Sequence, residues 1–253
     1  MSLHRFYLPP SRWSEDQPEL DPADAHHCTD VLRLGSGDAV TVFDGQGNEA
    51  SATLTEVTRK HTFLSLGERR STPKPRCSLT LAQAVPKGKN MDLVIQKAVE
   101  LGASFLIPLL SERTVVRLDG SGDAERKQAR WQSIALEACK QCGQNWMPEV
   151  GLPRAMKEFF GKLPPVDLML VASLQPGARS IKEVISSFET MHGGLPESTL
   201  VLIGPEGDFT PEEIALALSA GAHPITLGPI ILRTETAALY CLSVLGHELF
   251  GNH

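Results

Sequence analysis

The stretch Thr199-Leu-Val-Leu-Ile-Gly-Pro-Glu-Gly-Asp-Phe-Thr-Pro-Glu-Glu-Ile214 decides the fold. It begins as an apolar strand that ends at Gly204, and a tight loop then leads into a helix. Thr210 is a favourable N-cap, Pro211 suits the first helical position, and Glu213 completes a capping box. This order places small residues at the carboxyl end of a strand, where a ligand can approach the backbone. The pattern also fits a plain tight turn, and it matches neither a Rossmann nor a P-loop signature.

A second stretch of the same kind is Ile225-Thr-Leu-Gly-Pro-Ile-Ile-Leu-Arg-Thr-Glu-Thr-Ala-Ala-Leu239, which runs from a strand through Gly-Pro into a helix. Its apolar pair, Ile231 and Leu232, fits either a buried core or the wall of a ligand site. Arg233 and Glu235 at the mouth of the helix either pair with each other or face a ligand. Two Gly-Pro loops at adjacent strand ends predict one composite pocket.

Short apolar runs alternate with helical patterns around these stretches, which predicts a mainly parallel α/β sheet covered on both faces. The expected strands cover residues 78–85, 105–110, 166–172, 199–203 and 224–227. Two apolar stripes at helical spacing are expected to face the sheet: Met91, Ile95, Ala98 and Val99 in one helix, and Trp131, Ala135, Ala138 and Cys142 in the next.

The polar, basic segment 68–76 contains two prolines, so we expect neither helix nor sheet to run through it. The chain is therefore expected to divide into domains of residues 1–72 and 73–253. Alternating residues on either side of the turn-forming segment 44–48 predict a hairpin in the first domain, and a small β-barrel follows from this pattern. The expected elements of that domain are a helix over about 22–32 and strands over 39–43, 49–57 and 61–66.

The 253 residues carry 24 Lys and Arg against 30 Asp and Glu, and the net charge of −6 argues against non-specific coating of nucleic acid. The charge is uneven, because residues 74–140 hold 11 basic and 7 acidic side chains, whereas residues 141–253 hold 6 and 12. The basic half fits a solvated helical face or a track for phosphates. Five scattered cysteines and the absence of a signal sequence or an 18-residue apolar span predict a cytoplasmic protein.

No metal site is expected. The pair Cys139 and Cys142 lacks a second C-x-x-C, and both lie within an expected helix, which favours structural cysteines. Nothing in the spacing completes a site around His26 and His27. The chain also lacks the G-x-S-x-G and H-E-x-x-H signatures of common hydrolases.

Together with Gly204–Gly207 and Leu227–Ala237, several further motifs follow in order along nearly the whole chain: His26–Arg33, Lys87–Gly102, Ser111–Val115 and Glu137–Gly143. In this order they resemble the ribosomal RNA small subunit methyltransferase E family, which belongs to the SPOUT class of RNA methyltransferases. Three positions depart from the family's usual pattern. The family usually carries Gly where this chain has Asp208, and Arg where it has Ile230 or Gln144.

The resemblance implies a PUA-like, RNA-binding β-barrel followed by an α/β methyltransferase domain with a trefoil knot, acting as a homodimer. It implies methyl transfer from S-adenosylmethionine to N3 of a specific uridine in 16S ribosomal RNA, within the small ribosomal subunit and away from membranes. A SPOUT relative that methylates ribose 2′-O or another base, and a non-catalytic RNA-binding adaptor, are the alternatives.

The same resemblance suggests roles for individual residues. Arg233 is expected to orient the uridine or stabilise its developing negative charge, and Glu235 is a weaker candidate for relaying the proton. The expected cofactor-binding residues are Ser173, Ile203, Gly204, Pro205, Glu206, Gly207, Leu227, Gly228, Ile231, Leu232 and Ala237. The expected RNA contacts are Arg5, His27, Arg33, Lys87, Lys89, Arg113, Arg117, Arg126 and Arg130.

Overall fold

The computed structural model describes residues 4–58, 60–115, 120, 122–175 and 177–251. The chain forms two compact units. The N-terminal unit comprises Met1–Lys74 together with Leu136–Met147, and the C-terminal unit comprises Pro75–Ala135 and Pro148–His253.

A four-stranded sheet in the order β1-β2-β3-β4 forms the N-terminal unit. Its strands are β1 (Arg5–Tyr7), β2 (Ala39–Phe43), β3 (Asn48–Val57) and β4 (Thr62–Ser71). The predicted hairpin is confirmed, because β2 and β3 pair antiparallel. Strand β4 is longer than expected and enters the segment predicted to lack strand. Its last residues are exposed, so polar side chains there face solvent, and the two prolines follow only after the strand has ended.

The expected helix over 22–32 is α-helical only in α1 (Pro22–His26). The Asp21 carboxylate caps this helix by accepting the backbone N–H of Asp24. A single π-helical turn, η2 (His27–Val31), then continues it, and a short 3₁₀ turn, η1 (Pro10–Arg12), precedes it. One side of the sheet and these turns share an apolar core that includes Phe6, Leu8, Trp13 and Leu54.

The segment Leu136–Met147 belongs to the N-terminal unit because it docks on the turn between β2 and β3. The backbone N–H of Gly47 donates to the Asn145 carbonyl at 2.9 Å, and that of Met147 donates to the Gly45 carbonyl at 3.0 Å. The indole ring of Trp146 occupies the space that a Cβ at Gly47 would need. This position therefore requires glycine.

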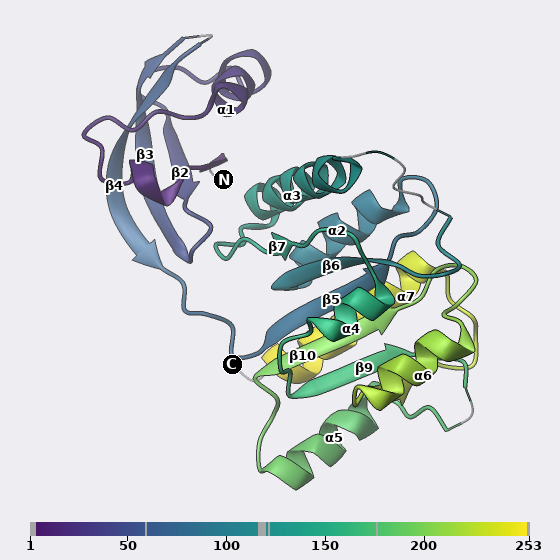
Figure 1. The fold of residues 1–253 in the computed structure, drawn as a ribbon. Helices are drawn as coiled ribbons and strands as arrows, with labels where there is room; N and C mark the ends of the chain where they lie inside the picture. The colour runs from purple at the N-terminus through teal and green to yellow at the C-terminus, as the bar shows by residue number, and fades with distance from the viewer. Residues whose placement is uncertain (1–3, 59, 116–119, 121, 176, 252–253) are drawn as a thin grey trace. The chain divides into compact units, whose positions relative to one another are not determined.

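The C-terminal unit contains a parallel sheet in the order β11-β9-β10-β5-β6-β7, with β8 also pairing with β6 (Figure 1). This arrangement confirms the predicted α/β class. The strands are β5 (Ser78–Ala84), β6 (Phe105–Leu110), β7 (Glu149–Val150), β8 (Arg154–Ala155), β9 (Leu168–Ala172), β10 (Ser198–Ile203) and β11 (His223–Ile225). The trefoil knot stays a prediction.

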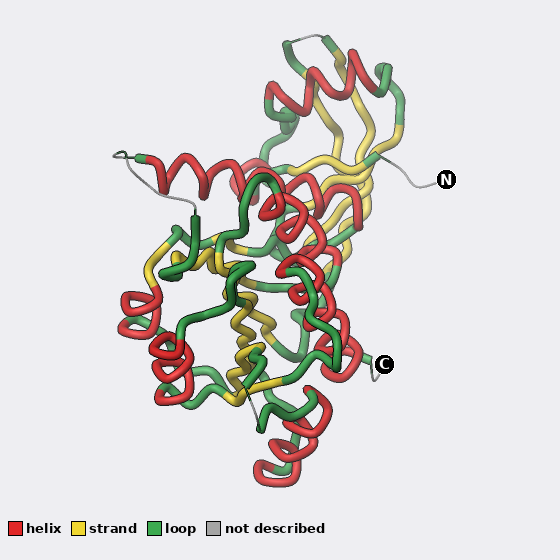
Figure 2. Tube along the Cα trace, turned by 90° about the vertical axis from the view of Figure 1, so that its right-hand side faces the viewer, coloured by secondary structure: helices red, strands yellow, loops and turns green. Residues whose placement is uncertain are grey.

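Helices lie on both sides of this sheet (Figure 2). On one side, α2 (Asn90–Glu100) and α5 (Ile181–His192) both pack against α7 (Thr234–Phe250), which contacts β10 and β5. On the other side, α4 (Met156–Gly161) packs against α6 (Pro211–Ser219). Helix α3 (Asp123–Cys142) begins in the C-terminal unit and ends in the N-terminal unit.

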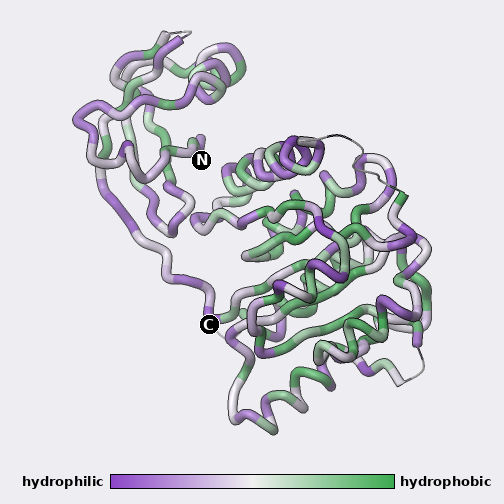
Figure 3. The backbone as a smooth tube through the Cα atoms, viewed as in Figure 1, coloured by the Kyte–Doolittle hydropathy of each residue, from purple (hydrophilic) through white to green (hydrophobic). Residues whose placement is uncertain are grey.

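The central strands β9 and β10 consist mostly of hydrophobic residues (Figure 3), as strands buried on both faces require. The predicted stripe of α2 is confirmed, since all four of its residues are buried. The stripe of α3 is wrong at one position. Cys142 is exposed, and Cys139 is buried in its place because the last turn of the helix presents that face to the core. Among the described residues, no helix is both long and apolar enough to span a membrane.

Candidate functional site

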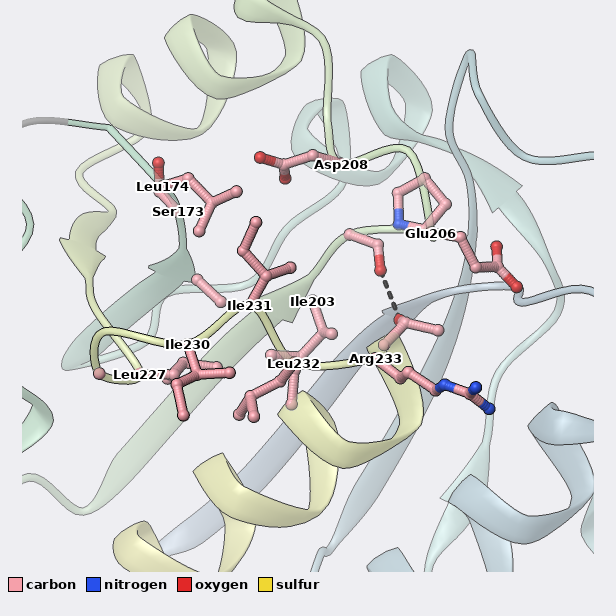
Figure 4. A pocket seen from close by; sticks show the side chains of 16 residues that line it. Ser173, Leu174, Ile203, Glu206, Asp208, Leu227, Ile230, Ile231, Leu232 and Arg233 are labelled. Atoms are coloured by element: carbon pink, nitrogen blue, oxygen red, sulfur yellow. Dashed lines mark hydrogen bonds between the residues drawn. The ribbon is translucent and has the colours of Figure 1, made fainter.

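The loops that follow β10 and β11 enclose a cavity of about 310 Å³ at the carboxyl edge of the parallel sheet (Figure 4). The end of β9 closes it on one side. The predicted composite pocket therefore exists. Its lining residues are Ala172, Ser173, Leu174, Ile203, Gly204, Pro205, Glu206, Asp208, Leu227, Gly228, Ile230, Ile231, Leu232, Arg233, Thr234 and Ala237.

The loop after β10, residues 204–209, is held by its own hydrogen bonds and by the start of α6. The Thr210 hydroxyl accepts the Glu213 backbone N–H at 3.3 Å, and the Glu213 carboxylate accepts the Thr210 backbone N–H at 3.0 Å, so the predicted capping box is confirmed. A Cβ at Gly204 would lie only 3.1 Å from both Asp208 Oδ1 and the Phe209 nitrogen. Glycine at position 204 therefore lets the loop fold back tightly.

Two neighbouring loops form hydrogen bonds with residues 204–209. The Glu206 carboxylate accepts the backbone N–H of Lys87, which follows β5, at 2.9 Å. The Arg113 guanidinium, which follows β6, donates to the Gly207 carbonyl at 2.5 Å. The ends of three parallel strands thus meet around residues 204–209, as the topology of an open parallel sheet dictates.

A buried polar chain links this loop to α7. The Gln83 side-chain amide donates to the Thr234 hydroxyl at 2.9 Å, and that hydroxyl donates to the Gly204 carbonyl at 2.6 Å. Gln83 and Thr234 are both buried. Each of these groups would be costly to leave unpaired, so the chain fixes the start of α7 against the end of β10.

The loop after β11, residues 226–233, is held more loosely. The backbone N–H of Gly228, at φ +110°, donates to the Thr226 hydroxyl at 3.3 Å. The side chains of Ile230 and Ile231 are 75% and 77% exposed although both line the cavity. Arg233 is the N-cap residue of α7 and its side chain makes no capping hydrogen bond. Its guanidinium extends away from the apolar wall (Figure 4).

The comparison with known proteins agrees with this geometry. A family model described as an RNA methyltransferase domain matches residues 72–246, and one described as an RNA methyltransferase PUA domain matches residues 20–66. A Bacillus subtilis protein named Ribosomal RNA small subunit methyltransferase E is 33% identical over 231 residues, which cover 89% of this chain and 88% of that protein. This chain belongs to that family.

Two solved structures resemble the chain over almost its full length. A Legionella pneumophila methyltransferase with bound S-adenosylmethionine has a TM-score of 0.88 and 32% identity, and the match covers 98% of both chains. The Neisseria gonorrhoeae ribosomal RNA small subunit methyltransferase E, also bound to S-adenosylmethionine, has a TM-score of 0.83 and 32% identity over 96% of both chains.

Within this methyltransferase fold, the structure brings together all but one of the expected cofactor-binding residues. The exception is Gly207, whose carbonyl is taken by Arg113 and which lies outside the lining. Ala172, Leu174, Asp208, Ile230 and Thr234 also line the cavity but were not among the expected site residues. The first two stand at the end of the expected strand over 166–172, so their position at the carboxyl edge was the available signal.

The two expected catalytic residues differ in position. Arg233 lines the cavity, and among the described residues it forms no ion pair with Glu235 or any other carboxylate. Glu235 is half-buried in the first turn of α7 and does not line the cavity. A carboxylate in that position also stabilises the N-terminus of the helix, which gives Glu235 a structural explanation.

The expected RNA contacts fall into three groups. Lys87, Lys89 and Arg113 are exposed beside the cavity loops of the C-terminal unit. Arg126 and Arg130 are exposed but contact Asp123 and Asp92 respectively. His27 and Arg33 are exposed on the N-terminal unit, and Arg117 lies outside the described residues.

Arg5 is not suited to contact RNA. Its side chain is only 12% exposed, and its guanidinium donates to the Glu49 carboxylate at 2.9 Å and to the Asn145 side chain at 2.7 Å. It also stacks on the Phe43 ring. Burial alone would raise the pKa of Glu49, but the hydrogen bonds from Arg5 and Asn145 outweigh burial and lower it. We therefore leave Arg5 out of the RNA-binding surface.

No group of three or more potential metal ligands gathers among the described residues. Cys139 is buried, and burial raises the pKa of its thiol to about 12, so it is neither a thiolate ligand nor a reactive nucleophile at neutral pH. His26 instead contacts the Asp30 carboxylate one helical turn away, at 2.6 Å.

Proposed function

We propose that this protein transfers a methyl group from S-adenosylmethionine to N3 of a specific uridine in 16S ribosomal RNA. The observation that carries the proposal is the cavity between the two Gly-Pro loops, with a single unpaired cation, Arg233, at its mouth among the described residues. Family membership and two S-adenosylmethionine-bound relatives support it.

The lining fits S-adenosylmethionine. A volume of about 310 Å³ lies within the roughly 300–1,000 Å³ of small-molecule sites. The side chains of Ile203, Ile231 and Leu232 offer flat apolar walls for an adenine ring. The backbone of Gly204 and Gly228, free of side chains, offers hydrogen-bonding groups at close approach. When bound, the cofactor would supply the methyl group of its sulfonium. The sulfur would keep the electron pair of the broken C–S bond.

The chain's own groups must then bring uridine N3 in line with that methyl group. Neutral N3 is a poor nucleophile, so its proton must leave as the new N–C bond forms. Negative charge then develops on the base, and the Arg233 guanidinium, which no carboxylate of the described chain neutralises, is the group placed to stabilise it. Glu235 remains our candidate to accept the proton, and Glu235→Gln tests it. A loss of methyl transfer without loss of stability supports that role.

Lys87, Lys89 and Arg113 are proposed to hold the RNA backbone beside the cavity, together with Arg126 and Arg130 and with His27 and Arg33 of the N-terminal domain. Removing one phosphate-binding cation weakens binding and flattens its salt dependence by about one unit of slope. Lys87→Ala is a clean test because its bond to Glu206 uses the backbone N–H, which the substitution keeps. An unchanged salt slope for Lys87→Ala and Lys89→Ala contradicts this surface.

We further propose that residues 1–72 and 73–253 act as the RNA-binding and methyltransferase domains of a cytoplasmic homodimer. The family resemblance supports this arrangement. Light scattering of the purified protein is expected to give twice the monomer mass.

The experiment that tests the proposed function is nucleoside mapping of 16S ribosomal RNA from cells with and without this protein, repeated with purified protein and cofactor. The expected result is 3-methyluridine at one position only in its presence. Methylation at ribose 2′-O or on another base supports a different member of the SPOUT class. Failure to bind S-adenosylmethionine in calorimetry supports a non-catalytic adaptor, an alternative that rests on Ile230 replacing the usual Arg.

A further inference from the structure

Asp208 is an unusual residue in the cavity wall. Its backbone has φ +61°, in the left-handed region that favours glycine, and Asp208 and Arg33 are the only described non-glycine residues with positive φ. A side chain retained at a position where glycine is less strained points to a use for that side chain.

The geometry places its carboxylate against the ligand space. Oδ1 accepts the backbone N–H of Phe209 at 2.8 Å, and it lies close to the position that a Cβ on Gly204 would occupy. The carboxylate extends from residues 204–209 across the cavity toward Leu174, above Ile231 (Figure 4). Among the described residues, no protein group donates a hydrogen bond or pairs with Oδ2.

The other charges around the cavity do not neutralise Asp208. The Glu206 carboxylate is held by the Lys87 backbone and points away from the apolar wall (Figure 4). Arg233 stands on the opposite side and extends outward. The side chains of Leu174 and Ile231, which line the cavity with Asp208, are apolar. A half-buried carboxylate beside an apolar wall attracts a ligand cation more strongly than it would in water.

We propose that Asp208 binds the cationic methionyl end of S-adenosylmethionine, through its free oxygen Oδ2, and thereby selects the charged cofactor over neutral adenosine thioethers. This inference rests on the proposed function, since it needs S-adenosylmethionine in this cavity. The methionyl end carries two positive charges, on its sulfonium and its ammonium group, and one negative charge on its own carboxylate. The adenosine end is neutral, so it fits the apolar wall of Ile203, Ile231 and Leu232.

A purely structural role for Asp208 is the competing explanation, because Oδ1 already supports the turn. Asp208→Asn separates the two roles. Asparagine tolerates the left-handed conformation, keeps an oxygen for the Phe209 N–H and has the same size, but it carries no charge. The variant therefore removes the charge and leaves the turn in place.

Calorimetry of wild type and Asp208→Asn with two ligands tests the proposal. The ligands are S-adenosylmethionine and 5′-methylthioadenosine, which shares the adenosine end and lacks both cations. A charge-assisted hydrogen bond predicts about tenfold weaker binding of S-adenosylmethionine by the variant and less than about twofold change for 5′-methylthioadenosine. Asp208→Gly, which also removes the carboxylate, is expected to match the asparagine variant.

Three results overturn the inference. If Asp208→Asn binds S-adenosylmethionine as wild type does, the carboxylate serves the turn alone and the proposed function stands. If both ligands weaken equally, the substitution has disturbed the adenosine site, and the charge is not selective. If wild type binds neither ligand, the proposed function fails and takes this inference with it.

Discussion

The two loops around the cavity each connect a strand of the parallel sheet to a helix, but one is held firmly and the other is not. Residues 204–209 are fixed by the capping box of α6, by Glu206 and Arg113 at their outer side, and by Thr234 from α7. Residues 226–233 carry two highly exposed isoleucines and an arginine that makes no capping bond. The first loop is organised before any ligand binds. The second carries apolar side chains that the free chain leaves uncovered.

This difference predicts that substitutions in the two loops have different effects on stability and on ligand binding. Changes in the fixed loop and its supports should lower the stability of the protein along with ligand binding. Changes in the second loop should impair binding or methyl transfer and leave stability almost unchanged, because the free protein derives little energy from exposed side chains.

The largest effect is expected for Arg233→Ala. Loss of a cation that stabilises charge in the transition state reduces methyl transfer to RNA about 100-fold, whereas the free energy of unfolding changes by less than about 0.5 kcal/mol. Single-turnover transfer of a labelled methyl group measures the first quantity and urea unfolding the second. Lys182→Ala, an exposed cation on α5, is the matched control and should retain activity. Near-wild-type turnover of Arg233→Ala contradicts the assigned role.

Thr234→Val tests the support of the fixed loop. Valine has nearly the same shape but leaves the Gly204 carbonyl unpaired and removes one of the two hydrogen bonds of the Gln83 amide, which keeps its bond to the Ala84 carbonyl, so the free energy of unfolding should fall by about 2 kcal/mol. Binding of S-adenosylmethionine should weaken in the same variant. Thr234→Ser keeps the hydroxyl and should recover most of both losses in urea unfolding and calorimetry. A serine variant as unstable as the valine variant shows that packing, and not the hydrogen-bond chain, fixes the loop.

Ile231→Ala tests the second loop. Its side chain is 77% exposed in the free protein, so the stability should stay within about 0.5 kcal/mol of wild type. If the side chain is covered by adenine in the complex, its loss weakens S-adenosylmethionine binding roughly tenfold. Leu218→Ala removes a partly exposed apolar side chain of α6 outside the cavity and should bind normally. Unchanged affinity for Ile231→Ala places the adenine elsewhere.

Thr210→Ala removes the N-cap of α6 and is expected to cost about 1 kcal/mol of stability. Thermal unfolding measures this loss, and methyl transfer at low temperature should remain measurable. The comparable exposed hydroxyl of Thr190, on α5, lacks a capping role, so Thr190→Ala should be close to neutral. A Thr210→Ala protein as stable as wild type shows that the capping box does not restrain the fixed loop.

The smallest effect concerns acid. The backbone N–H of Glu212 and the Thr210 hydroxyl lower the pKa of the Glu212 carboxyl. A lowered folded-state pKa contributes stability that is present above the unfolded value of 4.5 and is lost as the pH falls through the folded value. Between pH 7 and pH 3, Glu212→Gln should therefore lose less stability than wild type. Identical acid-unfolding curves contradict this contribution.

Much of the fixed loop was predictable because its determinants are local. Thr210, Pro211 and Glu213 specify the start of a helix within four residues, and apolar runs bounded by glycine specify strands. The pocket followed from two such strand ends in a parallel sheet. The partners of Arg5 were not predictable, since Glu49 and Asn145 lie 44 and 140 residues away along the chain. From the sequence alone, a basic residue near the N-terminus is expected to be a surface cation.

Other features were not predicted because they depend on packing or on backbone conformation and not on the local sequence. The exchange of Cys142 for Cys139 on the buried face depends on how the last turn of α3 packs, which helical spacing alone does not specify. The direction of the Asp208 carboxylate follows from a left-handed backbone and a bond to Phe209, and neither is visible in the residue types. Thr234 was missed because nothing in its local sequence distinguishes a residue that lines a cavity from one in the core.

A crystal structure of the protein soaked with S-adenosylmethionine tests the central claim most directly. We expect the adenine ring to lie against Ile231 and Leu232, the methionyl end to reach residues 204–209, and the methyl group to face the side of the cavity where Arg233 stands. Ligand density that contacts only one of the two loops, or that lies in another part of the molecule, contradicts it.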